Sequence, residues 1–447
     1  MRSLRLATVS PLLLALACTS QPTASDEDAG TGGTGSGRDG GGLQRADGGS
    51  TGTDGGPTGT DGGNNVSDAG SETSDDAGTG ELFPDGGACN FANRGDPDRD
   101  RVVLLGHPFT EEPGVDGTEI SGMTLTAAGT LTIDGVRVDV GTRPARITFV
   151  PSGAVALVLG EDGTLVSVEV KSAQELTVMD RVTLPSAGYG DLVVAPDGAT
   201  FYAVGSNVAE TSGISTVTVG CEGQLTVHED AFFNLRLTDS LALTADGTRG
   251  YVLGGQAVFE PVDDNDVRLL RRKETGWEQV AAFDVFTDFI DTLRLALSPD
   301  GSTLVIPNGS AFSSEGGQVS VLTASGETLT ESVRLTNLPD AREALFSADG
   351  QTALVSLLQP GKVVALSNPG TGWAVSQTVT GVGLAEQMAI VRRGALNGRV
   401  LVPSIDPNGG PNVVSLQITG PGQVEDLGQV ELGSGSEQIV VPIAVME

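Results

Sequence analysis

The sequence has few of the residues that most enzymatic and nucleic-acid-binding sites require. Histidine occurs only as His107 and His228 among 447 residues, and 25 basic residues face 58 acidic ones. The two histidines lack the spacing of an HExxH metalloprotease helix. A formal net charge of −33 argues against binding to nucleic acid or to an anionic membrane surface. Cationic partners or divalent ions fit this charge, but a solvated acidic surface explains it more simply.

The N-terminus has the features of an export signal. Arg2 and Arg5 precede an apolar run that ends at Ala17, and residues 1–17 are too few to span a bilayer as a mature helix. Ala15-Leu16-Ala17-Cys18 resembles the lipobox of bacterial lipoproteins, although Ala15 stands where that family usually has leucine. Ordinary small-x-small signal cleavage would cut the same bond. We favour the lipoprotein, because the cysteine directly follows the apolar run.

The resemblance implies that Cys18 carries acyl chains, each methylene of which adds about 0.8 kcal/mol of membrane affinity. Because Thr19 follows the cysteine, the resemblance also implies the outer membrane, at its periplasmic or surface face. The expected location is therefore the cell envelope, with the lipid anchor as the contact with the membrane.

Residues 18–88 differ from the rest of the chain. They are rich in Gly, Asp, Ser and Thr, and Phe83 is their one aromatic residue. Such a segment buries too little apolar surface to offset its chain entropy, so we expect a disordered linker. A flexible chain of this length spans roughly 45 Å, which would hold a domain clear of the lipid headgroups.

Cysteine is scarce as well. If Cys18 is acylated, Cys89 and Cys221 remain, and an exported chain permits a disulfide between them. A bonded pair and two free thiols are both compatible with the sequence. A bond would fix the start of the domain, predicted at 89–447, to a turn between two strands.

The domain is built from a repeat of short strands, with almost nothing of helical period. The turns of the repeat end at Gly153, Gly198, Gly247, Gly301 and Gly350, at intervals of 45, 49, 54 and 49 residues. Four short strands and their turns consume about 40 to 50 residues, as in one blade of a β-propeller. A degenerate sixth turn lies within residues 392–398.

The Asp-Gly pair that recurs in four of the repeats is a turn rather than a chemical site. In Ser298-Pro299-Asp300-Gly301, proline presets φ, Asp300 bonds its own backbone, and Gly301 takes the left-handed conformation at no steric cost. Five such turns at regular spacing, four with Asp-Gly and the first with Ser152-Gly153, are explained as hairpins.

A seventh unit is divided between the two ends of the domain. Residues 437–442 echo residues 386–391, which open the sixth unit, but no strands follow to complete them. The missing strands stand near the start of the domain, within 101–109, 119–126 and 130–140. Closure of the ring in this way removes the exposed sheet edges. We therefore predict an all-β, seven-bladed propeller, although six or eight blades also fit.

The repeat resembles seven-bladed propellers of the YVTN type, which include lactonase-like proteins. Their pattern of sPDG, an apolar strand and a g-x-v-s-v strand occurs here as SPDGSTLVIPNG with GGQVSVLTA and as APDGATFYAVG with GISTVTVG. The resemblance covers residues 101–447, and no unit reads YVTN literally. It implies the fold more firmly than the function, because propellers host many activities.

The best candidate site is a ring of polar residues at the start of the inner strands. In five repeats a polar residue stands seven positions before the turn glycine, and the sixth and closing units supply glutamines at equivalent places. If the strands line the axis, these residues meet at one channel mouth and bind a ligand there. Solvent exposure of strand ends explains the same pattern without a ligand. The ring comprises Arg146, Asp191, Ser240, Arg294, Glu343, Gln387 and Gln438.

The remaining candidates are better explained by structure. His107 precedes a proline at a strand end, and His228 is expected on a strand surface. The acidic stretches 96–100 and 263–266 lack a complete calcium-loop pattern, so no metal site is predicted. Trp277 and Trp373 follow Thr-Gly in equivalent positions, which indicates equivalent packing of an outer strand. No cofactor motif and no catalytic residue are identified.

The sequence therefore predicts a monomeric, lipid-anchored propeller that acts as a binding or scaffolding module for an unknown protein or small ligand. The alternative is a periplasmic lactonase-like hydrolase with its site at the channel mouth. A quinone-dependent or surface-layer propeller is a third reading, without a distinctive motif. A deep mouth with convergent Arg, Glu and His would favour the enzyme, and a broad apolar rim would favour a protein partner.

Overall fold

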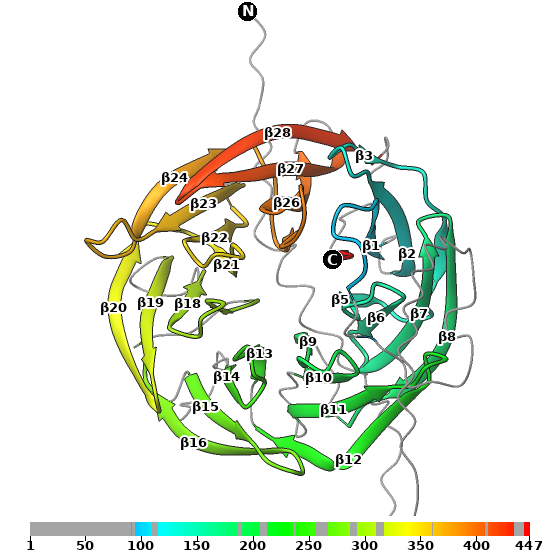
Figure 1. The fold of residues 1–447 in the computed structure, drawn as a ribbon, viewed down its shortest axis with the longest axis horizontal. Helices are drawn as coiled ribbons and strands as arrows, with labels where there is room; N and C mark the ends of the chain where they lie inside the picture. The colour runs from blue at the N-terminus through cyan, green and yellow to red at the C-terminus, as the bar shows by residue number, and fades with distance from the viewer. Residues whose placement is uncertain are drawn as a thin grey trace, which may run out of the picture. The chain divides into compact units, whose positions relative to one another are not determined.

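The computed structural model shows a ring of seven antiparallel β-sheets around a central axis (Figure 1). The described residues belong to one compact unit within Ala77–Glu447, and no helix among them is able to cross a membrane. Gln438, Cys18, Cys89 and the acidic stretch 263–266 lie outside the described residues. The structure describes residues 91, 94–109, 115–185, 190–205, 212–235, 238–254, 267–286, 293–309, 317–359, 361–406, 410–432 and 442–447.

Six blades are consecutive in sequence, each running from an inner strand at the axis to an outer strand at the rim. Blade 1 is β5(Pro144–Phe149), β6(Val155–Gly160), β7(Thr164–Ser172) and β8(Glu175–Thr183), and blade 2 is β9(Leu192–Val194), β10(Thr200–Gly205), β11(Gly213–Val219) and β12(Leu225–Asn234). Blade 3 is β13(Thr238–Leu243), β14(Arg249–Gly254), β15(Val267–Arg272) and β16(Trp277–Phe283), and blade 4 is β17(Ala296–Leu297), β18(Thr303–Asn308), β19(Gln318–Ser325) and β20(Thr328–Thr336). Blade 5 is β21(Ala341–Phe346), β22(Thr352–Leu357), β23(Lys362–Ser367) and β24(Ala374–Thr380), and blade 6 is β25(Ala389–Ile390), β26(Arg399–Asp406), β27(Gly410–Gly420) and β28(Gln423–Glu431).

The five repeat turns, four of them Asp-Gly and the first Ser-Gly, are hairpins, as predicted. Each turn glycine has a positive φ, between 65° and 78°, and in the turn of blade 4 the Gly301 N–H donates to the Ser298 carbonyl at 2.8 Å. Asp300 accepts from the backbone N–H of Ser302 at 3.0 Å, and Asp246 accepts from that of Thr248 in the same way. The aspartates therefore cap turns. All five turns join an inner strand to the next strand, so they share one face of the ring, here called the turn face.

The seventh blade joins the two ends of the domain. It contains β29(Ile443–Val445), β1(Arg101–Phe109) and β2(Asp116–Leu125), followed by two short pieces, β3(Leu131–Thr132) and β4(Arg137–Asp139). The C-terminal strand is innermost and pairs with β1, with Ala444 opposite Leu104. Closure by the C-terminus is thus observed, with Ile443–Val445 as the closing strand, and residues 437–441 of the predicted closing segment lie outside the described residues. The predicted strand over 130–140 is interrupted. Residues 133–136 leave the sheet there, and the Gly122 N–H bonds the Val136 carbonyl at 3.0 Å.

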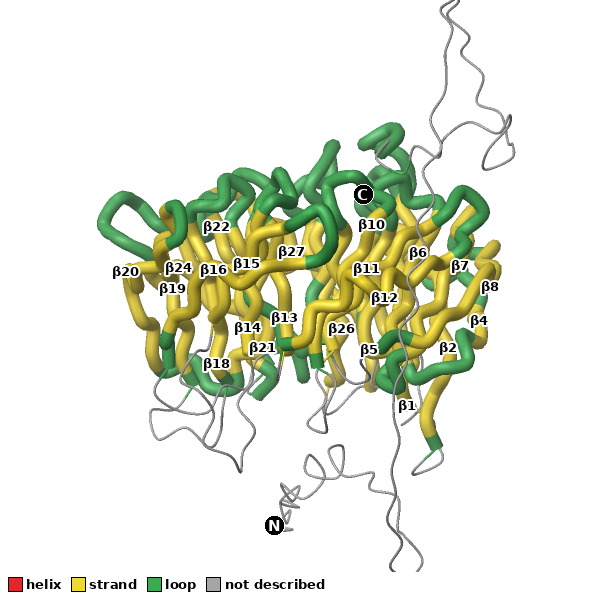
Figure 2. Tube along the Cα trace, turned by 90° about the horizontal axis from the view of Figure 1, so that it is seen from below, coloured by secondary structure: helices red, strands yellow, loops and turns green. Residues whose placement is uncertain are grey.

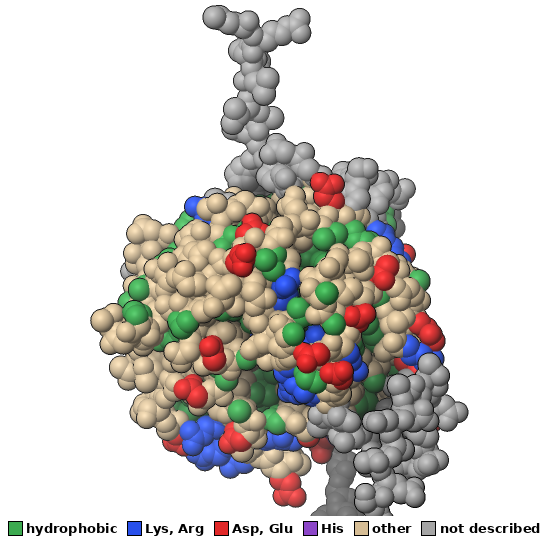
Figure 3. Space-filling view, turned by 45° about the horizontal axis from the view of Figure 1, so that its top comes forward, with side chains coloured by type: hydrophobic (Ala, Val, Ile, Leu, Met, Phe, Trp, Pro, Cys, Tyr) green, Lys and Arg blue, Asp and Glu red, His purple; other side chains and the backbone are tan. Residues whose placement is uncertain are grey.

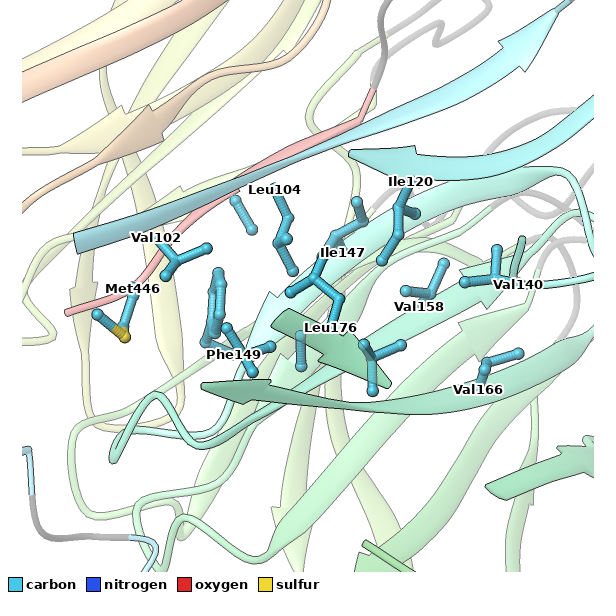
Figure 4. Close-up of a cluster of buried hydrophobic side chains, with 14 of the residues drawn as sticks. Val102, Leu104, Ile120, Val140, Ile147, Phe149, Val158, Val166, Leu176 and Met446 are labelled. Atoms are coloured by element: carbon cyan, nitrogen blue, oxygen red, sulfur yellow. The ribbon is translucent and has the colours of Figure 1, made fainter. Parts of the chain in front are cut away.

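Apolar side chains fill the space between neighbouring blades, because alternate residues of each strand face the two adjacent sheets. Between blades 7 and 1, Leu104, Ile120, Val158 and Val166 are each fully buried (Figure 4). Ala444 and Met446 enter this cluster, whereas Ile443 and Val445 enter the one between blades 6 and 7. Three residues of β29 therefore contribute to two interfaces.

The two tryptophans pack against neighbouring aromatic residues, as expected of structural positions. Trp277 opens β16, is buried, and meets Tyr202 of blade 2 edge-on with ring centroids 4.9 Å apart. Trp373 lies just before β24 and meets Phe346 edge-on at 5.8 Å. Each indole thus helps to hold an outer strand.

The aspartates of residues 96–100 serve the backbone. Asp98 accepts from the Ala395 N–H at 2.6 Å, and Asp100 accepts from the Ala127 N–H at 2.7 Å. Among the described residues, no group of three His, Cys, Asp or Glu side chains is arranged to hold a metal ion. Cys221 is disulfide-bonded, and Cys18 and Cys89 are the two other cysteines of the chain.

Candidate functional site

The predicted polar ring is a buried network rather than a solvated rim. The side chains of Asp191 and Glu343 are fully buried, as is Ser240, and Arg146 is nearly so. Solvent exposure of strand ends, the simpler explanation of the pattern, is therefore wrong for these positions. The residues lie at the ends of the inner strands away from the turn face (Figure 2 shows the two faces of the ring edge-on).

Local backbone irregularities turn these residues toward the axis. The strand register shifts between Pro144 and Arg146 and between Thr238 and Ser240, and a shift between Ala341 and Ala344 brackets Glu343. A bulge bends the strand and re-aims a side chain. In the alternate blades 2, 4 and 6, regular pairing of the inner strand begins only after the ring residue. The polar residues thus lie where the backbone hydrogen bonding of the inner strands is irregular or has not yet begun.

Four charged residues meet at the axis, here called the charged quartet: Arg146, Asp191, Arg294 and Glu343. Arg146 lies 3.7 Å from Asp191 (Nε to Oδ1) and 3.6 Å from Glu343 (Nη1 to Oε1). Arg294 lies 3.5 Å from Asp191 (Nε to Oδ2) and 3.4 Å from Glu343 (Nη1 to Oε1). Each arginine therefore bridges both carboxylates. Since Arg146 and Glu343 come from blades 1 and 5, the contacts cross the axis.

The carboxylates are fixed by further hydrogen bonds. Asp191 accepts from the Ser240 hydroxyl at 3.1 Å and from the Leu241 N–H at 3.4 Å. Glu343 accepts from the Met388 N–H at 2.5 Å. Buried carboxylates require such partners, since an unpaired buried charge is strongly destabilising. Blades 1 to 6 are thereby linked in one polar network, because Ser240 also accepts from the Leu295 N–H at 3.2 Å.

Burial and charge have opposite effects in the quartet. Burial raises the pKa of the Glu343 carboxyl, against the lowering effect of Arg146, Arg294 and the Met388 N–H. The pKa of Arg294 is raised, chiefly by the charge of Asp191 and further by Glu343. With all four groups ionised, the formal charges of the two arginines and the two carboxylates cancel.

Arg294 is the member of the quartet that reaches solvent. Its side chain is 36% exposed, against none for its two carboxylate partners. Within the described residues its Nη2 has no hydrogen-bond acceptor, whereas Nη1 donates to Glu343 at 3.4 Å. One edge of this guanidinium is therefore available to a ligand.

The inner strand of blade 4 is held toward blade 5. Arg294 and Glu343 form an isolated parallel bridge, in which the Ala344 N–H donates to the Arg294 carbonyl at 3.0 Å. The Leu293 N–H donates to the Arg342 carbonyl at 2.8 Å. Two neighbouring inner strands thus share backbone hydrogen bonds at the level of the quartet, which fixes the backbone on both sides of Arg294.

The two glutamines of the predicted ring have different outcomes. Gln387 is buried and its amide donates to the Ala145 carbonyl at 3.3 Å, rather than to the quartet, while its Oε1 has no partner within the described residues. Gln438 lies outside the described residues. Sequence reasoning missed Ser356, whose hydroxyl accepts from the Glu343 N–H at 3.1 Å, because a serine in an alternating strand gives no distinct signal.

The histidines lie away from this site. His107 is buried in blade 7, and its Nε2 is 2.7 Å from the Ser121 hydroxyl. Burial lowers the pKa of His107 to about 4, with a smaller effect of Arg137. His228 pairs with Thr218 on the outer strands of blade 2, at 3.0 Å. The site therefore joins arginine and carboxylates without histidine.

No protein-family model matches the chain, and no curated protein matches its sequence. Solved structures do match its fold. A protein of Bacteroides uniformis, provisionally assigned as a 6-phosphogluconolactonase, shares 14% identity at a TM-score of 0.59, covering 77% of this chain and 99% of its own. The periplasmic gluconolactonase of Pseudomonas aeruginosa shares 17% identity at a TM-score of 0.58, covering 78% and 99%. A protein of Lactobacillus plantarum shares 15% at 0.59, covering 78% and 99%. At these identities, the likeness establishes a seven-bladed propeller similar in fold to lactonase-like proteins.

Proposed function

We propose that the propeller is a binding module for a small, uncharged, oxygen-rich ligand at the Arg294 end of the axis. The observation that carries the proposal is the exposed guanidinium edge of Arg294 beside two carboxylates held fully buried. When all four groups are ionised, the charges of the quartet cancel, so the quartet gives no net attraction to an ion. The free N–H groups of Arg294 suit the hydroxyl or carbonyl oxygens of a sugar, polyol or lactone.

Hydrolysis is the second candidate, favoured by the likeness to proteins whose names specify gluconolactone chemistry. A general base must lie within hydrogen-bond reach of the substrate or of its water. Asp191 and Glu343 are fully buried and occupied by serine and backbone donors. This arrangement favours binding over catalysis.

The proposal is tested by thermal shift on the full chain at pH 7.5. The compounds are neutral sugars, polyols and gluconolactone, with gluconate as the charged counterpart of the lactone. A ligand present at 100 times its Kd stabilises the fold by about 2.7 kcal/mol. We expect a neutral member to raise Tm, and Arg294→Gln to weaken its binding about 10- to 100-fold through loss of charged hydrogen bonds.

Arg334→Gln is the matched control, because Arg334 is also partly exposed and paired with a glutamate, Glu331, but lies on outer strand β20. The proposal is contradicted if both variants lose ligand affinity equally, or if no compound raises the Tm of the wild type. Sustained lactone hydrolysis that Arg294→Gln abolishes would favour the enzyme instead.

We further propose that the chain is lipid-anchored in the cell envelope through Cys18. The apolar run ending at Ala17 and the Gly-rich residues 18–88 support this. Expression with labelled palmitate should label the wild type and not Cys18→Ser. Equal partition of both forms into the aqueous phase of a detergent separation would contradict the anchor.

A further inference from the structure

The two carboxylates of the charged quartet contact the arginines in different ways. Both arginines approach the same oxygen of Glu343, Oε1, at 3.6 and 3.4 Å, whereas Asp191 receives them on separate oxygens. Glu343 also spans the axis, since its partners come from blades 1 and 4. Loss of the charge on Glu343 would therefore remove one of the two carboxylate partners of each arginine at once, while both arginines stay paired to Asp191, which Ser240 and Leu241 hold in place.

Protonation of Glu343 changes the net charge of the quartet. With Glu343 ionised, the quartet sums to zero, and with Glu343 protonated it sums to plus one. The groups facing this carboxyl are Arg146 from β5, Arg294 and Asp191 from the segments before β17 and β9, and the Met388 N–H before β25. Burial raises the pKa of the Glu343 carboxyl, which favours its neutral form.

We propose that the Arg294 end of the axis is also a proton-linked receptor for small oxyanions, which binds a sulfate-like, phosphate-like or carboxylate group when Glu343 takes up a proton. This inference rests on the proposed function, because it uses the same exposed edge of Arg294. The anion would accept from Arg294 Nη1 and Nη2, the former released by Glu343. Binding is coupled to uptake of one proton, so anion and proton each strengthen the binding of the other.

The acidic composition of the domain opposes anion binding unless the site itself becomes positively charged. The domain from residue 89 carries 45 acidic and 21 basic residues, which repel anions at neutral pH. Figure 3 shows acidic and basic side chains interspersed over the face in view, without a large area of one charge. A site that acquires positive charge only on protonation would therefore bind anions in acid and exclude them near neutrality.

The test is isothermal titration of the full chain with sulfate at pH 5.5 and 7.5, at constant ionic strength set with NaCl. Sulfate is a dianion at both values, so its own charge is constant. We expect binding at pH 5.5 with net proton uptake, seen as a dependence of the heat on buffer ionisation, and at least tenfold weaker binding at pH 7.5.

Glu343→Gln should mimic the protonated form and bind sulfate with similar affinity at both pH values. Arg294→Gln should lose binding, and Glu331→Gln, which changes a paired carboxylate on β20, should behave as wild type. Sulfate binding that is equal at both pH values in wild type, or unaffected by Glu343→Gln, would overturn the proposal. A neutral ligand that binds at pH 7.5 while sulfate never binds would refute only this inference, whereas failure of every neutral ligand would refute the proposed function.

Discussion

At the scale of the residue, the turn glycines differ in what surrounds them. Gly301 and Gly153 have nearly equal φ values, 73° and 78°. A Cβ on Gly301 would meet its nearest atom at 4.0 Å, but one on Gly153 would meet Met446 at 2.4 Å. Both positions carry the conformational cost of a side chain at positive φ, and only Gly153 adds a steric one.

Gly301→Ala should therefore destabilise the fold by about 1 kcal/mol, and Gly153→Ala by about 2 to 4 kcal/mol because Met446 must move. Urea unfolding of both variants measures the difference. Equal losses would show that the contact with Met446 contributes nothing.

His107 makes stability depend on pH. Its folded pKa of about 4 lies below the ordinary 6.5, so the unfolded chain binds the proton first as pH falls. The free energy of unfolding should thus decline from about pH 6.5 to pH 4, by up to about 3 kcal/mol in all. His107→Gln should flatten this part of the curve, measured by urea unfolding between pH 7.5 and 4.5. An unchanged slope would mean that another group causes the decline.

At the scale of the element, β29 is the closure of the ring. It pairs with β1 and supplies residues to the cores on both sides of blade 7. Deletion of residues 436–447 should therefore expose the inner edge of β1 and remove apolar contacts from two interfaces.

A point variant distinguishes the effect of disrupted packing from the effect of deleting residues 436–447. Ala444→Asp places an unpaired carboxylate in the buried cluster of Figure 4 and should cost more than about 4 kcal/mol. Ala374→Asp, on the exposed start of β24, is the control. Fluorescence of Trp277 and Trp373 follows blades 3 and 5 during unfolding. Unaltered cooperative melting of the deletion variant would contradict closure by β29.

The sequence was sufficient to predict the positions of the blades and their hairpins, but not every interruption of a strand at the rim. The spacing of glycines predicted the blades and their hairpins, because the left-handed turn has a strict residue requirement. The interruption at residues 133–136 was not predicted, although the apolar alternation changes phase there, from Leu131 and Ile133 to Val136 and Val138. Ile133 and Val136 are both exposed in the structure, and an apolar residue at the rim does not reveal from the sequence alone that it leaves the sheet.

At the scale of the whole molecule, the repeat brought the site together. Counting seven positions back from each turn glycine identified Arg146, Asp191, Arg294 and Glu343, which converge on the axis. What the count could not give was their burial or their pairing across blades 1 and 5. Those depend on the diameter of the ring and on bulges in the inner strands, and both arise only when the blades pack together.

The same geometry separates the candidate site from the first described residues of the domain. Phe91 is buried, its carbonyl accepts from the Ser152 N–H at 2.8 Å, and Arg99 donates to the Ser152 carbonyl at 2.9 Å, so the first described residues lie on the turn face. The quartet lies at the opposite ends of the inner strands.

Hydrogen–deuterium exchange of the full chain, with and without the neutral compound that raises Tm most, tests the central claim most directly. With the ligand bound at the charged quartet, we expect slower exchange in peptides that cover residues 190–194, 293–297 and 341–346, and no change at the turns 244–248 and 347–352. Protection confined to the turn face or to the outer strands would contradict it, because the ligand would then bind away from the charged quartet.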